Sequence, residues 1–150
     1  MRLVTVAGES MAPSYRQFDL LLTRAVGRNT VLPRGAVVVF RHGGARMLKR
    51  VVGVPGDRVE LEAGRLFVND RSVEGRSRVP GAHVQNWRVP KGGYFVAGDN
   101  ARVSDDSRVW DEPFVPVDDV ERVVTRRLAG RRRRTSPGPE RLPVAAHPVG

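Results

Sequence analysis

The stretch MLKRVVGVPGD, residues 47–57, passes from an apolar, β-branched run into Pro55, Gly56 and Asp57. Its first part, Met47 to Val54, has the composition of a strand, and the Gly and Pro that follow are typical of a turn. The same pattern recurs along most of the chain. Further strands are predicted at residues 3–6, 20–25, 36–41, 59–61, 66–68 and 94–96. The sequence therefore predicts a mainly β fold.

Two short polar segments separate these predicted strands. Glu62-Ala63-Gly64-Arg65 is typical of a hairpin turn, and Asn69-Asp70 is a second turn signal. The segment from Val117 to Leu128 fits two structures. Its valines fall on one face of a helix, but Val123-Val124-Thr125 favours a strand, which we prefer.

Charge and composition divide the 150 residues into one domain, residues 1–128, and a basic tail, residues 129–150. The net charge is +10, yet residues 1–125 hold 19 Lys and Arg against 15 Asp and Glu, whereas residues 126–150 hold 7 against 1. The run Arg131–Arg134 is followed by Thr, Ser, Pro and Gly, which predicts a tail without fixed structure. Such a run can bind anionic lipid or nucleic acid.

Several classes of protein are disfavoured by composition. The chain has no cysteine, so disulfides and thiolate chemistry are excluded. Its three histidines are scattered, so we expect no metal site and no cofactor. No run approaches the roughly 20 apolar residues of a membrane helix, and residues 1–6 are too short for a signal-peptide core. We therefore expect neither a membrane span nor a secretion signal in this chain.

Lysine is rare in this sequence, which makes Lys49 informative. Of 26 basic residues, only Lys49 and Lys91 are lysines. Arginine stays charged, whereas a buried lysine can lose its proton and act as a general base. Taken alone, however, Lys49 is better explained as an outward-facing residue of a half-buried strand.

A serine that such a base could activate follows the first predicted strand. In Gly8-Glu9-Ser10-Met11-Ala12-Pro13-Ser14, Ser10 lies between a glycine and a proline, which indicates a turn. A serine needs a base to become a strong nucleophile, and no His–Asp pair with suitable context is present. Lys49 is the candidate base, although a simple loop accounts for this segment when it is taken alone.

A third polar cluster, residues 98–108, follows the predicted strand 94–96. It contains Asp99, Asn100, Ser104, Asp106 and Arg108. Its short polar side chains could form a hydrogen-bonded loop beside a catalytic pair. Alone, it is typical of a surface loop.

Together these clusters resemble the type I signal peptidases, in order, spacing and context, over residues 4–124. The matching segments are residues 8–14, 18–21, 34–40, 47–57 and 89–100, followed by Ser104, Asp106, Ser107 and Arg108. The resemblance implies an antiparallel β fold with a short hairpin insertion at residues 58–92.

The resemblance also implies roles for individual residues. Ser10 would attack the scissile carbonyl, and neutral Lys49 would accept its proton. Ser104 would orient the Lys49 amine, and Asp106 and Arg108 would form a supporting ion pair. The backbone N–H of Ser10 would stabilise the oxyanion. The substrate would be a precursor protein with small residues before the cleavage site.

The chain departs from the family pattern in places. Gly8 replaces a second oxyanion-hole hydroxyl of some members, Phe18 and Ala36 replace residues more usually Gly and Asp, and residues 101–103 differ from Arg-Asp-Asn. Only nine residues precede Ser10, too few for the membrane anchor of the family, so either the start was trimmed or the chain is a soluble relative that matures some other precursor. The resemblance implies action at the outer face of the membrane, but the sequence leaves the localisation open.

Two other functions remain open at this level. One is a soluble serine–lysine protease that cleaves itself or one specific precursor, as repressor-type relatives do; those relatives lack the box at residues 98–108. The other is a non-enzymatic module whose Arg131–Arg134 run binds an anionic membrane or nucleic acid. We expect nucleic acid not to be the main partner, while the run could assist membrane docking.

Overall fold

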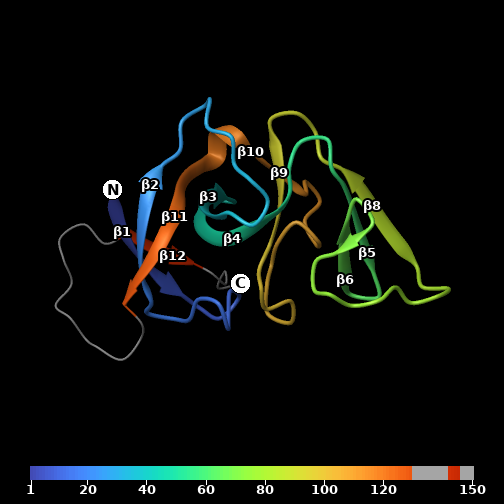
Figure 1. The fold of residues 1–150 in the computed structure, drawn as a ribbon. Helices are drawn as coiled ribbons and strands as arrows, with labels where there is room; N and C mark the ends of the chain where they lie inside the picture. The colour runs from blue at the N-terminus through green and yellow to red at the C-terminus, as the bar shows by residue number, and fades with distance from the viewer. Residues whose placement is uncertain (130–141, 146–150) are drawn as a thin grey trace.

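The computed structural model describes residues 1–129 and 142–145, and almost all of its regular structure is β (Figure 1). One 3-10 turn, Val117–Asp119, precedes the long strand β11. The strands are β1 Arg2–Ala7, β2 Leu20–Ala25, β3 Val37–His42, β4 Ala45–Gly53, β5 Arg58–Glu62, β6 Arg65–Val68, β7 Arg71–Ser72, β8 Val84–Arg88, β9 Gly93–Ala97, β10 Phe114–Pro116, β11 Val120–Ala129 and β12 Leu142–Ala145.

The larger of two sheets closes on itself. Its strands follow the order β10-β9-β4-β12-β1-β2-β11-β3, and β3 also pairs with β4. This last pairing closes a ring of β4, β12, β1, β2, β11 and β3, while β9 and β10 extend from β4. Most neighbours are antiparallel; β12 is parallel to both β1 and β4. Closure brings β1, near the N-terminus, close to β4 in the middle of the chain.

The smaller sheet, in the order β7-β6-β5-β8, forms the predicted insertion at residues 58–92 and lies beside the ring (Figure 1). Its β5–β6 hairpin turns at Ala63 and Gly64, whose φ angles of 49° and 77° are left-handed. Two successive left-handed residues match the twist of a tight hairpin. The predicted turn is therefore confirmed.

The core consists of three clusters of buried side chains. Two lie on the large sheet, around Phe40 and Leu48 respectively. The third surrounds Phe95 of β9 and includes Val59 of β5, so it joins the small sheet to the large one. Gly53 is required there, because a Cβ at this position would lie 2.8 Å from Val59 Cγ2.

Most predicted strands are confirmed within a residue or two, and residues 120–129 form the preferred strand, β11. The sequence missed β7, β8, β10 and β12. Within the predicted tail of residues 129–150, backbone pairing with β1 forms the short strand β12 at Leu142–Ala145, which the sequence did not predict. Ala129 ends β11, and residues 130–141 and 146–150 of the predicted tail, including Arg131–Arg134, lie outside the described residues.

Within residues 1–129 and 142–145, no helix has the length and apolar character to cross a membrane. The same part of the chain contains no group of three or more His, Cys, Asp or Glu side chains placed to hold a metal ion.

Candidate active site

Ser10 lies in the turn that follows β1 and is fully buried. Gly8, with φ of 84°, lets the chain leave β1 sharply. The turn is attached to the loop after β9, because Asn100 donates its backbone N–H to Ser10 O at 2.8 Å and its side chain to Glu9 O at 3.2 Å. Backbone contacts therefore fix the position of the Ser10 hydroxyl.

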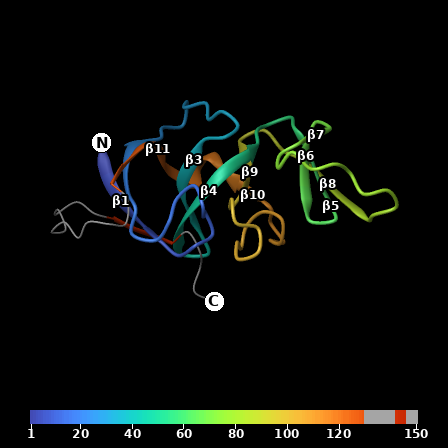
Figure 2. The same cartoon turned by 60° about the horizontal axis from the view of Figure 1, so that its bottom comes forward.

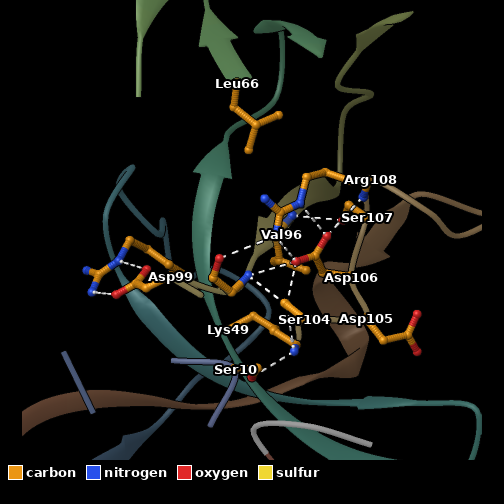
Figure 3. A network of polar contacts seen from close by, with 12 residues as sticks. Ser10, Lys49, Leu66, Val96, Asp99, Ser104, Asp105, Asp106, Ser107 and Arg108 are labelled. Atoms are coloured by element: carbon orange, nitrogen blue, oxygen red, sulfur yellow. Dashed lines mark hydrogen bonds and ion pairs between the residues drawn. The ribbon is translucent and has the colours of Figure 1, made fainter. Parts of the chain in front are cut away.

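Lys49 lies in the middle of β4, opposite Val38 of β3, and is also fully buried. Its Nζ lies 3.0 Å from Ser10 Oγ and 3.0 Å from Ser104 Oγ (Figure 3). Burial lowers the pKa of Lys49 to about 8, although Asp106 and Asp105 oppose this shift and Arg108 adds to it. The alternative of an outward-facing lysine is wrong.

Asp106 anchors the far end of this hydrogen-bond chain. Its Oδ2 accepts the Ser104 hydroxyl at 2.5 Å, and both its oxygens accept from the Arg108 guanidinium, at 2.5 and 2.9 Å. Burial raises the pKa of Asp106, but the hydrogen bonds and charge of Arg108, together with Ser104, outweigh it and leave the pKa below its usual value. Asp106 is therefore a carboxylate, held by an arginine that is itself 8% exposed.

The direction of these hydrogen bonds follows from Asp106. A carboxylate only accepts, so the Ser104 hydroxyl must donate to it and can offer Lys49 only a lone pair. Lys49 therefore donates one N–H to Ser104. A neutral amine held in this way still has a lone pair, and Ser10 Oγ is within its reach.

Gly98 shapes the same site, a role that the sequence did not reveal. Its backbone N–H donates to Ser104 Oγ at 3.2 Å and to Asp106 Oδ2 at 2.9 Å. A Cβ on Gly98 would lie 2.2 Å from Ser104 Oγ and 2.6 Å from Ser10 O. Only glycine fits between the two serines, whereas in the sequence a glycine before a polar loop indicates no more than a turn.

Arg50 and Asp99 form a second ion pair that the sequence did not assign. Arg50 Nε and Nη2 donate to the two Asp99 oxygens at 2.9 and 2.7 Å, and Arg50 Nη1 donates to Gly35 O. Arg50 follows Lys49 on β4 and Asp99 follows Gly98, so this pair joins the two segments that carry the site. The available signal was that Arg50 directly follows Lys49 and that Asp99 belongs to the predicted polar cluster at residues 98–108.

A cleft of about 730 Å³ lies beside the site, between the small sheet and the loop after β9. Apolar side chains of Val52, Leu66 and Val73 line it together with several arginines. Gly98 and Arg108 are lining residues, whereas Ser10 and Lys49 are not. Leu66 faces the site in Figure 3.

The structure thus brings together all five side chains predicted from the sequence: Ser10, Lys49, Ser104, Asp106 and Arg108. They come from the turn after β1, from β4 and from the loop after β9. The predicted Asp106–Arg108 ion pair is present. The roles of these residues, and of the Ser10 backbone N–H, stay predictions.

Comparisons with known proteins relate this chain to one family. The family model described as signal peptidase, peptidase S26, matches residues 1–128. A signal peptidase IB of Staphylococcus aureus is 35% identical over 128 residues, covering 71% of this chain and 67% of that protein. A signal peptidase I of Pseudomonas fluorescens is 33% identical, covering 65% and 46% respectively. A crystal structure of a signal peptidase I from Enterococcus faecalis superposes with a TM-score of 0.51 and 31% identity, covering 64% of this chain and 98% of that one.

Proposed function

The chain belongs to the S26 family of signal peptidases, which are serine peptidases, and we propose that it cleaves signal or leader peptides from precursor proteins with Ser10 as nucleophile and Lys49 as general base. Cleavage would follow small residues of the precursor, as the family resemblance implies. The observation that carries the proposal is the 3.0 Å approach of Lys49 Nζ to Ser10 Oγ, with both residues buried.

The first step is acylation. Neutral Lys49 takes the Ser10 hydroxyl proton while Ser10 Oγ forms a bond to the scissile carbonyl carbon. The carbonyl oxygen becomes an oxyanion, towards which the Ser10 backbone N–H would donate. When this intermediate collapses, the C–N bond breaks, and the Lys49 ammonium returns the proton to the departing amine.

The second step is hydrolysis of the resulting Ser10 ester. Neutral Lys49 now takes a proton from water, whose oxygen attacks the ester carbon. The C–O bond to Ser10 breaks, and the proton on Lys49 returns to Ser10 Oγ. The products are the carboxylate of the leader peptide and the amino terminus of the mature protein.

Lys49 can serve as this base at neutral pH because its pKa is about 8. At pH 7, about one molecule in ten then carries the neutral amine. Ser104, Asp106 and Arg108 act as positioning residues: Asp106 orients the Ser104 hydroxyl, and Ser104 orients the amine. Docking of Arg131–Arg134 on an anionic membrane surface stays a hypothesis from the sequence.

Replacing the nucleophile tests the proposed function. Ser10→Ala removes the only atom that the mechanism bonds to substrate, so cleavage of precursors should fall at least ~10³-fold. Mass spectrometry of precursors with small residues before the leader junction measures the loss, and circular dichroism checks the fold. Ser77→Ala, at an exposed serine of the loop between β7 and β8, should cleave normally. Full activity of Ser10→Ala would refute the proposal.

A further inference from the structure

Strand β12 fills the gap between the two segments that carry the proposed catalytic pair. Leu142 to Ala145 run parallel to Val4 to Ala7 of β1, and Ala145 also pairs with Met47 of β4. In Figures 1 and 2, β12 lies alongside β1 although the two are at opposite ends of the chain. A C-terminal segment thus occupies the space between β1 and β4.

Without β12, the edge of β4 that it covers would be unpaired at Met47. β3 pairs with Ala45 through Arg50 and takes one edge of β4. On the other edge, β9 pairs only from Arg50 onward, and β12 pairs at Met47. Lys49 therefore lies between the part of this edge that pairs with β12 and the part that pairs with β9. Since β2 covers the other edge of β1, the gap between β1 and β4 is a slot for one extended chain.

The direction of this slot leads to Ser10 and Lys49. Ala145 is level with Ala7 of β1 and with Met47 of β4. Ser10 comes three residues after Ala7, and Lys49 comes two residues after Met47. Any extended chain that ran in this register would reach the level of Lys49 about 7 Å beyond the position of Ala145.

Two features of the sequence suggest that Leu142–Ala145 can leave the slot between β1 and β4. Pro143, opposite Thr5, has no N–H to donate, and proline is rare in a strand that has neighbours on both sides. Val144, Ala145 and Ala146 are small residues, like those that the proposed function expects before a cleavage site. The segment therefore resembles a substrate more than a permanent strand of the ring.

We propose that Leu142–Ala145 is an internal competitor of the substrate, which occupies the slot between β1 and β4 and must be displaced before a precursor strand can enter. The proposal rests on the proposed function. Residues 130–141, twelve in number, connect the occupant to the end of β11, so its binding is intramolecular. A tether this short gives an effective concentration in the millimolar range, so even weak pairing keeps the slot filled.

Weakening β12 in the full chain tests this competition. Ala145→Pro removes a donor at the residue that pairs with both β1 and β4. If the slot is closed nine-tenths of the time, opening it should lower the apparent KM for a precursor peptide about tenfold and leave kcat unchanged. Thr135→Pro adds a proline to the same tail outside β12 and should change neither. An unchanged KM, or a loss of kcat together with a lower unfolding temperature, would overturn the proposal.

Amide hydrogen exchange separates this proposal from the proposed function, because it needs no catalysis. In the Ala145→Pro variant, the amides of Thr5 and Ala7 should exchange faster than in the wild type and the Thr135→Pro control. Val6 donates its N–H to Asp19 O at 3.0 Å on the β2 side, and successive backbone amides of a strand alternate, so the amides of Thr5 and Ala7 face β12. The synthetic peptide LPVAAH, added in trans, should restore their protection, whereas a peptide of the same composition in scrambled order should not. If these amides stay equally protected in Ala145→Pro, the proposal that Leu142–Ala145 fills the slot is contradicted, even if cleavage is normal. If no variant cleaves any precursor, the proposed function fails, and the competition fails with it.

Discussion

At the scale of single residues, the site depends on the difference between lysine and arginine. The chain uses arginine at 24 of its 26 basic positions, including Arg108, whose permanent charge holds Asp106 ionised. At position 49, burial lowers the pKa of the lysine to about 8, so this side chain can lose its proton at moderate pH. An arginine at the same position would stay charged. The two basic side chains thus act in opposite ways within one hydrogen-bond chain.

The pH dependence of cleavage should report Lys49. The proposed mechanism needs the neutral amine, so kcat/KM should rise tenfold per pH unit below the pKa of about 8 and level off above it. Initial rates with a precursor peptide between pH 6 and pH 9.5 give this profile. A rate that falls as pH rises from 6 to 8 would contradict a neutral base, since protonation would then favour the reaction.

At the scale of elements, three segments hold the site together. Asn100 attaches the Ser10 turn to the loop after β9, and Arg50–Asp99 attaches that loop to β4. Ser107 accepts the Val96 N–H at 2.9 Å, so the loop also bonds back to β9. The buried pair of Asp106 and Arg108 lies at its centre, which makes the loop a structural element and not a mobile surface turn.

Breaking this pair should cost stability as well as activity. Asp106→Asn leaves the Arg108 charge buried without its carboxylate, which should lower the free energy of unfolding by about 3–5 kcal/mol at pH 7. Urea denaturation followed by circular dichroism measures the change. The control is Asp118→Asn, in an exposed pair with Arg28 at 3.7 Å, which should cost less than about 0.5 kcal/mol. Equal costs for both variants would show that Asp106 has no special structural role.

At the scale of the whole molecule, local patterns predicted most of the fold. Alternating β-branched runs and turn residues located β1 to β6, β9 and β11, since these signals are local. They missed β8, whose VQNWR sequence is mostly polar, and β10, which ends at a proline. They could not predict ring closure, because the pairing of β3 with β4 and β11 depends on contacts between distant segments.

The site was predictable in part for the same reason. Each of Ser10, Lys49 and Ser104 is compatible with an ordinary loop or strand in its own segment, and only their joint resemblance to a family predicted that they meet. The roles of Gly98 and Arg50 needed three-dimensional distances: the space for a Cβ in one case and a bidentate contact in the other. The strand at Leu142–Ala145 was missed because a basic, Pro-rich neighbourhood predicts no fixed structure.

The substitution Lys49→Arg tests the central claim most directly. Arginine keeps the positive charge and much of the length of the side chain but does not lose its proton. We predict that kcat/KM for a precursor peptide falls at least ~10³-fold between pH 7 and pH 9, within the range that general base catalysis supplies. Lys91→Arg makes the same change at the other lysine of the chain, which is exposed, and should leave the rate unaltered. A Lys49→Arg enzyme as active as Lys91→Arg would contradict the lysine base.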